Sequence, residues 1–167
     1  MGREVSWPRT SLFLYSYCSY NLSNMKYLII PLKKFKEDFY PEMVMAQKEI
    51  YPNEPRVQPE DSEPYEDNSM VVAALDDNTL AGFCAFSICK KARNCDFFGS
   101  NLYFYVKPEY RSSLVAGTLI KYTENIAFTR GCKEFEWEVS LNSPLVETFD
   151  KRKEYKKESI IYSKSLI

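Results

Sequence analysis

The sequence contains no histidine among its 167 residues. This absence excludes the Ser-His and Cys-His pairs of nucleophilic enzymes, and every metal site that is built on histidine ligands. Cysteine occurs five times, an odd number without any CxxC pair, which argues against a structural zinc site or a disulfide framework. We therefore expect no metal, and reduced thiols in the cytoplasm. The cysteines are Cys18, Cys84, Cys89, Cys95 and Cys132.

The chain also lacks an excess of charge and a long apolar run. Its formal net charge is −1, so nothing favours a nucleic-acid or membrane-surface partner. The apolar segment Ser11–Cys18 is too short for a secretory signal, and no later run reaches the length of a membrane span. Residues 1–24 have no periodicity, so we predict that they form an extension outside the core and that residues 25–167 form one domain.

The central stretch of the chain predicts a strand, a turn, a helix and a second strand. Leu102–Val106 is bulky and aromatic, as in a buried strand, and Pro108 ends it because proline has no N–H to donate. The apolar positions of residues 113–130 fall on one helical face, with Gly131 placed for a left-handed C-cap. Strict alternation predicts a half-buried strand over Glu134–Val139. This order forms a right-handed βαβ unit with parallel strands.

The start of this helix predicts an anion site. Ser112 and Ser113 are both suited to cap it. The first N–H groups of a helix have no partner within it, and they lie at the positive end of the helix dipole. In a βαβ unit these groups lie beside the carboxyl end of the first strand, so we expect a phosphate group to bind there.

Two motifs around this helix resemble the acetyl-CoA motif of the GNAT N-acetyltransferase superfamily. The first, Val106–Gly117, has a strand ending in valine, a Pro-Glu-Tyr-Arg turn, and the slots Arg/Gln-x-x-Gly-x-Gly/Ala. Arg111 and Ala116 match the first and last of these slots, whereas Leu114 occupies the glycine slot. The second motif follows the helix within residues 130–140.

The resemblance implies an α/β (α+β) fold, the acyl-CoA N-acyltransferase fold, with a mixed central sheet, helices on both faces and acetyl-CoA as cosubstrate. The main chain of Tyr105 and Val106 would bind the acetyl and pantetheine part, and the side chain of Asn142 would reach the cofactor. A leucine in the glycine slot would crowd the phosphate unless its side chain points away. An exposed arginine covering apolar surface is the alternative for the first slot. The pyrophosphate would be held by Arg111, Ser112, Ser113, Leu114, Val115, Ala116 and Gly117.

The rest of the chain predicts the other elements of such a sheet. Met25–Pro31 indicates a first strand, and residues 35–51 indicate a helix that Pro41 starts or kinks. The acidic, proline-rich residues 51–68 indicate a solvated linker, which the resemblance alternatively places near the acceptor site. The other expected elements are a hairpin of strands 69–75 and 80–88, a loop over 90–100, a helix capped by Ser143 with Pro144 at its first position, and a last strand over 155–162.

Transfer to an amine requires a base, because an amine of pKa about 10 is mostly protonated at neutral pH. The family often carries a glutamate base where this chain has Asn101 and Leu102, and a tyrosine acid where it has Phe149. The alternating glutamates of residues 134–138 are explained by a solvated strand face. The tyrosines that could replace the missing acid, among which the sequence does not select, are Tyr103, Tyr105 and Tyr155.

Two functions fit these observations. The first is an acetyl-CoA-dependent N-acetyltransferase, in which a primary amine of a small molecule or a protein attacks the thioester directly while the Val106 main-chain N–H holds the carbonyl oxygen. The second is a non-catalytic protein of the same fold that binds another protein through its aromatic and acidic surface. A homodimer is one assembly that the sequence allows, and neither a nucleic acid nor a membrane is expected as a partner.

Overall fold

The computed structural model describes residues 25–50, 68–92, 95–111 and 113–157 of the chain. The predicted extension over residues 1–24, nearly all of the acidic loop and most of the predicted last strand therefore lie outside the described residues. The chain divides into two compact units, of which the first ends at Glu136 and the second begins at Trp137.

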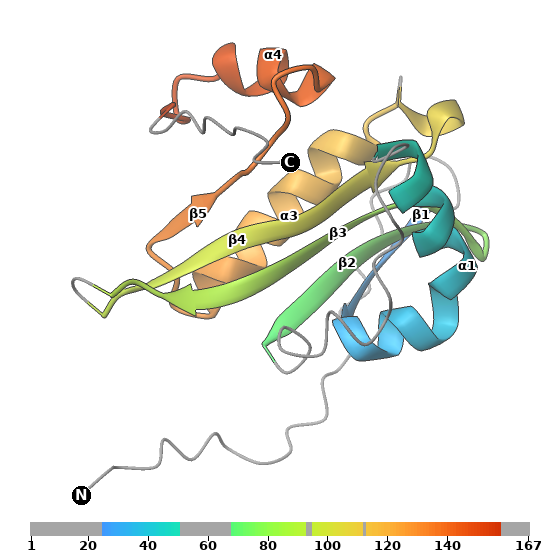
Figure 1. Cartoon of the computed structure of the whole chain (residues 1–167), viewed down its shortest axis with the longest axis horizontal. Coiled ribbons are helices and arrows are strands. Elements are labelled where there is room, and N and C mark those ends of the chain that lie inside the picture. Colours follow the sequence, from blue (N-terminus) through green and yellow to red (C-terminus); the bar gives the residue numbers. More distant parts are fainter. Residues whose placement is uncertain (1–24, 51–67, 93–94, 112, 158–167) are drawn as a thin grey trace, which may run out of the picture. The chain divides into compact units, whose positions relative to one another are not determined.

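A five-stranded mixed sheet forms the centre of the first unit, with its strands in the order β1-β2-β3-β4-β5 (Figure 1). Neighbouring strands from β1 to β4 pair antiparallel, whereas β4 and β5 pair parallel. Both the mixed sheet and the parallel pair of the βαβ unit are thereby confirmed. The strands are β1 Met25–Pro31, β2 Ser69–Asp76, β3 Thr79–Lys90, β4 Phe97–Val106 and β5 Glu134–Glu136.

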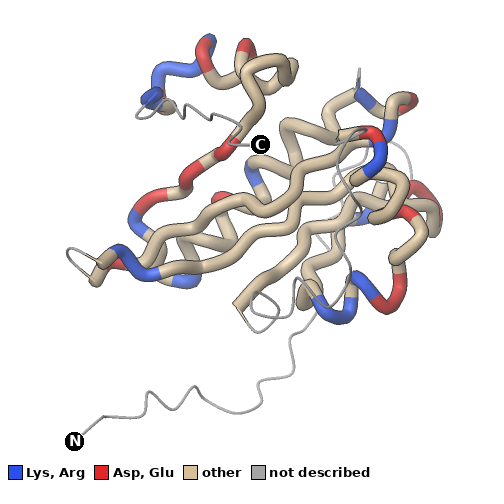
Figure 2. Tube along the Cα trace, in the orientation of Figure 1, with Lys and Arg blue, Asp and Glu red and all other residues tan. Residues whose placement is uncertain are grey.

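Helices α1 (Leu32–Ile50) and α3 (Val115–Thr129) cover opposite faces of this sheet. Side chains alternate along β2, so Val71 packs in the α1 layer and its neighbour Val72 packs in the α3 layer. Acidic and basic residues are interspersed along the described chain instead of gathering in one segment (Figure 2). None of the helices in the described residues is long and apolar enough to cross a lipid bilayer.

Helix α1 confirms the predicted helix and its disturbance by proline. Its backbone leaves the helical region at Phe39, where φ is −131° and ψ is 29°, two residues before Pro41. Proline lacks an N–H and its ring clashes with the preceding turn, so the helix bends there. The helix begins at Leu32, a few residues earlier than predicted, because Leu32 and Phe35 are already buried in the core.

The hairpin of β2 and β3 is confirmed, but the loop predicted over residues 90–100 is shorter than predicted. Strand β3 continues to Lys90 and β4 already begins at Phe97. Gly99, which the predicted loop included, lies within β4 and leaves room for a neighbouring ring. A Cβ added at Gly99 would lie 2.4 Å from Cδ2 of Phe135 on β5.

Helix α3 is slightly shorter than the predicted range of 113–130. Leu114, not a serine, takes the N-cap position, although Ser113 Oγ still accepts the N–H of the first helical residue at 3.2 Å. The predicted C-cap is confirmed, since Gly131 has a φ of 86°. Its N–H donates to the carbonyl of Phe128 at 2.9 Å, and the next N–H donates to the carbonyl of Ala127 at 3.0 Å. This pair of bonds is a Schellman motif.

The predicted strand over Glu134–Val139 is wrong beyond Glu136, after which the described chain has no strand structure. Alternation indicates which side chains are buried, but it does not indicate where the partner strand stops pairing. The partner here is β4, whose last residue paired with β5 is Ser100.

The second unit contains helix α4 (Pro144–Asp150), which starts as predicted. Ser143 Oγ accepts the N–H of Leu145 at 3.3 Å. The ring of Phe149 packs against Trp137 and Tyr155, at centroid distances of 5.6 and 4.6 Å. Residues 155–157 are not in a strand, so the predicted last strand does not start at Tyr155, and the remainder of that prediction lies outside the described residues.

Candidate active site

The first feature of the site is the half of β4 that pairs with no described strand on its β5 side. Strand β5 pairs with β4 only from Phe98 to Ser100. On the other edge, β4 stays paired with β3 as far as Val106. Lys107 donates its N–H to the carbonyl of Ala81 at 2.9 Å, so alternation along an antiparallel strand turns the main-chain groups of Val106 away from β3. Polar main-chain groups thus face the side that β5 leaves open.

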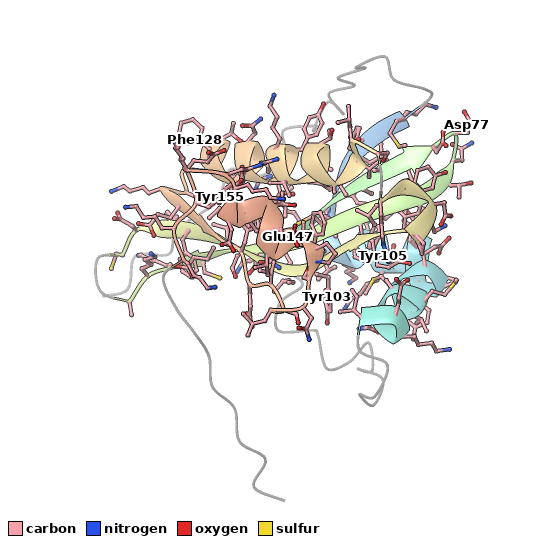
Figure 3. The ribbon with its side chains drawn as sticks, turned by 90° about the horizontal axis from the view of Figure 1, so that it is seen from above. Asp77, Tyr103, Tyr105, Phe128, Glu147 and Tyr155 are labelled. Carbon is pink, nitrogen blue, oxygen red and sulfur yellow. The ribbon has the colours of Figure 1, made fainter. Side chains whose placement is uncertain are left out.

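A β-bulge sets the side chains of this half of β4. The register shifts so that Ala85 pairs with Tyr103 while Phe86 pairs with Asn101, which leaves Leu102 as the extra residue. After the bulge, Tyr103 and Tyr105 point into the α1 layer of the core, as Figure 3 shows. Two of the tyrosines proposed from the sequence therefore lie on one face of the open strand.

The second feature is the start of α3, which follows β4 in the chain. Thr118 donates its N–H to the carbonyl of Leu114 at 3.0 Å. The described residues contribute no hydrogen-bond partner to the N–H groups of Ala116 and Gly117, which precede it. A Cβ added at Gly117 would meet no atom within 4 Å. This helix start therefore has the room and the donors that an anion requires.

Leu114 does not close this helix start by packing over it, because its side chain is 69% exposed. The sequence left open whether this leucine fills the phosphate position or points away. The exposure favours the second alternative, with the main chain of the loop left accessible. Ser112, which the resemblance also places in this loop, lies outside the described residues.

The third feature is a cluster of Glu49, Tyr105 and Arg111. The Tyr105 hydroxyl donates to Glu49 Oε2 at 2.8 Å, and the Arg111 guanidinium forms an ion pair with Glu49 Oε1. Arg111 Nε also donates to the carbonyl of Val106 at 2.9 Å, and its guanidinium carbon lies 5.9 Å from the centre of the Tyr105 ring. The arginine of the motif thus connects the last turn of α1 to the end of β4.

Hydrogen bonds and burial determine the protonation states of this cluster. The hydrogen bond from Arg111 lowers the pKa of the Glu49 carboxyl, despite some loss of solvation, and the bond from Tyr105 adds to this effect. Burial, assisted by the nearby carboxylate, raises the pKa of Tyr105 to about 12. At neutral pH the cluster therefore contains a carboxylate, a guanidinium and a protonated phenol.

Sequence reasoning missed Glu49. It occupies a polar position of an amphipathic helix, where a solvated glutamate is the ordinary expectation. Its two partners lie 56 and 62 residues further along the chain. Only folding brings them together, so no local pattern could have identified it.

The loop before α3 is held in place by a hydrogen bond to Asp76, the last residue of β2. The Tyr110 hydroxyl donates to Asp76 Oδ2 at 3.0 Å, and this bond raises the pKa of the phenol. The carbonyl of Tyr110 in turn accepts the N–H of Ser113 at 3.1 Å. These bonds fix the turn that delivers the chain from β4 into α3.

Other predicted residues lie elsewhere. Asn142 is exposed in the second unit, and its contact with a cofactor stays a prediction. Glu134 and Glu136 are exposed and both form ion pairs with Lys91, as a solvated strand face allows. Within the described ranges, no group of three or more cysteine or carboxylate side chains is arranged to hold a metal ion.

Residues 33–152 match the family described as the Acetyltransferase (GNAT) family. No curated protein sequence is significantly similar to the chain.

Solved structures share the fold at low sequence identity. An aminoglycoside acetyltransferase from an uncultured soil metagenomic sample has a TM-score of 0.69 at 11% identity, covering 86% of this chain and 96% of its own. The aminoglycoside acetyltransferase AAC(6')-Iy, in complex with a bisubstrate analog, has a TM-score of 0.65 at 20% identity, with 87% and 100% covered. Glucosamine-6-phosphate N-acetyltransferase from Arabidopsis thaliana has a TM-score of 0.61 at 16% identity, with 84% and 99% covered.

Proposed function

Because the chain belongs to the acetyltransferase (GNAT) family, we propose that it transfers the acetyl group of acetyl-CoA to a primary amine of a small molecule or a protein. Acetyl-CoA supplies the acetyl group as a thioester, which a neutral amine attacks directly. The protein then has to hold the donor, orient the amine and accept a proton. Positioning alone accounts for a large part of the rate of such bimolecular reactions.

The observation that carries this proposal is the start of α3 beside the half of β4 that does not pair with β5. The N–H groups of Ala116 and Gly117, to which the described residues contribute no hydrogen-bond partner, suit a diphosphate, and the side chain of Leu114 is exposed. The Val106 carbonyl is already bonded to Arg111, so the Val106 N–H is the group of that residue left to hold the thioester oxygen. Asn142, together with the remaining loop residues, stays a predicted contact.

The acceptor is the finer part of the proposal. Structural relatives whose names include aminoglycosides and glucosamine 6-phosphate support an amine on a small molecule. A protein amine reacts by the same chemistry, so we propose both classes and would assay both. We add a homodimer only as an expectation from the sequence.

Thermal or chemical denaturation with acetyl-CoA tests the proposal without knowledge of the acceptor. A ligand at about 100 times its Kd, bound only by the folded protein, should add roughly 2.7 kcal/mol to the free energy of unfolding. We expect this gain with acetyl-CoA and with CoA, and a much smaller gain with S-acetylpantetheine, which lacks the diphosphate. No gain at millimolar acetyl-CoA would instead support the non-catalytic alternative.

A further inference from the structure

An amine that attacks a thioester must give up a proton, and the residues expected to take it are missing from β4. The strand has Asn101 and Leu102 in the region of the family's glutamate, and the chain has no histidine. A positioned proton acceptor typically contributes about 10²–10⁴-fold to such a step. The structure nevertheless brings a carboxylate to β4, and this carboxylate comes from α1.

That carboxylate is Glu49, held at the end of α1 by donors from two other elements. Tyr105 of β4 donates to Oε2 at 2.8 Å, and Arg111 of the loop before α3 pairs with Oε1. Arg111 is itself fixed by its bond to the Val106 carbonyl at 2.9 Å. These bonds therefore hold the Glu49 side chain in a fixed position beside the end of β4.

The hydrogen bond between Tyr105 and Glu49 has a defined direction. An ionised carboxylate can only accept, so the phenol must be the donor. The O–H of Tyr105 then points to Glu49, and no described residue donates a hydrogen bond to the phenol oxygen, although the side chain as a whole is only 8% exposed. This oxygen can take up a proton only if it passes its own proton to Glu49.

The position of Tyr105 distinguishes it from the other two candidate tyrosines. It immediately precedes Val106, whose main chain is proposed to hold the thioester. Tyr103 lies on the same face but forms no hydrogen bond with a described residue. Tyr155 belongs to the second unit, where its ring packs edge-on against Phe149.

Resting on the proposed function, we propose that Tyr105 and Glu49 form a proton relay that deprotonates the attacking amine. The ammonium form first loses one proton to solvent, and the nitrogen of the neutral amine then forms a bond to the thioester carbonyl carbon while the C–S bond breaks with its electron pair leaving on sulfur. One proton moves from nitrogen to the Tyr105 oxygen while the Tyr105 proton moves to Glu49 Oε2. Glu49 then returns this proton to solvent, and the thiolate takes a proton from solvent.

In this relay Tyr105 is the catalytic residue, and Glu49 and Arg111 are positioning residues. Because the phenol O–H points to Glu49, the relay accepts the proton of the amine and does not supply the leaving sulfur. Glu49 is 39% exposed, so water can reach the carboxylate and remove the proton. The lowered pKa of Glu49 keeps its carboxylate ionised at neutral pH.

The test compares Tyr105→Phe, Glu49→Gln and the control Tyr103→Phe, with acetyl-CoA as donor and methylamine as a primary amine without recognition groups. Free CoA is measured with a thiol reagent. Tyr105→Phe and Glu49→Gln should each lower kcat by about 100-fold or more, while the Kd of acetyl-CoA and the unfolding midpoint stay near those of the wild type. Tyr103→Phe should retain the wild-type kcat.

Two further readouts separate a relay from a merely structural role. The double variant should be no slower than the slower single variant, because the two residues act as one unit. In 13C-tyrosine NMR, the ring signal that disappears in Tyr105→Phe should shift in Glu49→Gln and stay unchanged in Tyr103→Phe.

The outcomes also separate the relay from the proposed function. If the wild type binds acetyl-CoA but Glu49→Gln keeps the wild-type kcat, the relay is wrong and the cofactor site stands. If the wild type does not bind acetyl-CoA, the proposed function fails and the relay fails with it.

Discussion

Replacing Gly117 with leucine should weaken acetyl-CoA binding by roughly 100-fold and leave the protein folded. The free site has room for the new side chain, since a Cβ at Gly117 meets no atom within 4 Å. Leucine is also a better helix former than glycine by almost 1 kcal/mol. In the bound state the same side chain would occupy the space of the diphosphate. Losing two hydrogen bonds to a charged group at ~1.5 kcal/mol each corresponds to about a hundredfold in Kd.

Isothermal titration calorimetry measures this loss, with Lys121→Leu as the matched control. Lys121 is an exposed residue one turn further along α3, so the control adds the same side chain to the same helix. Its Kd should equal that of the wild type. Equal affinity of Gly117→Leu and the wild type would show that the diphosphate does not bind at the start of α3.

Replacing Phe83 with alanine should remove about 3–5 kcal/mol from the free energy of unfolding, a large part of what a domain of this size has. Phe83 is 2% exposed at the centre of the α1 layer. Its ring lies 4.8 Å from the ring of Phe35 and 6.1 Å from that of Tyr105, measured between centroids. The cavity would therefore open close to Tyr105 of the candidate active site.

Urea denaturation of Phe83→Ala and Phe128→Ala makes the comparison. Both variants remove the same atoms, but Phe128 is 76% exposed on α3 (Figure 3). The Phe128→Ala variant should change stability by no more than about 0.5 kcal/mol. Similar losses in the two variants would contradict the assignment of Phe83 to the core.

Much of the fold could be predicted because local sequence preferences and packing agree in β2, in α1 and at the end of α3. The run of β2 is apolar on both faces, and helices cover both faces. Pro41 marks the bend in α1, and Gly131 adopts the left-handed conformation that its position at a helix end suggests. Each of these features depends on a few neighbouring residues, which a sequence shows directly.

The wrong predictions concern places where distant segments meet. The sequence predicts a loop at Gly99, yet this glycine is a strand residue whose missing side chain accommodates Phe135 from β5. The length of β5 depends on where its pairing with β4 ends, and the alternating pattern of the β5 sequence contains no information about that point. The cluster at Glu49 likewise depends on the approach of α1 to β4.

The candidate site was predictable in part for the same reason. The loop residues from Arg111 to Gly117 are contiguous, so a local sequence motif is sufficient to identify them. The motif did not indicate that Arg111 is already engaged by Glu49 and by the Val106 carbonyl. That contact places the arginine between the proposed donor site and the proposed proton acceptor.

The central claim is that main-chain N–H groups at the start of α3 hold the diphosphate of acetyl-CoA. Titration of 15N-labelled protein with CoA, and separately with pantetheine, tests it most directly by NMR. We predict that the amide signals of Ala116 and Gly117 shift strongly with CoA and little with pantetheine. Unmoved signals at both residues, with CoA bound elsewhere on the protein, would contradict the account.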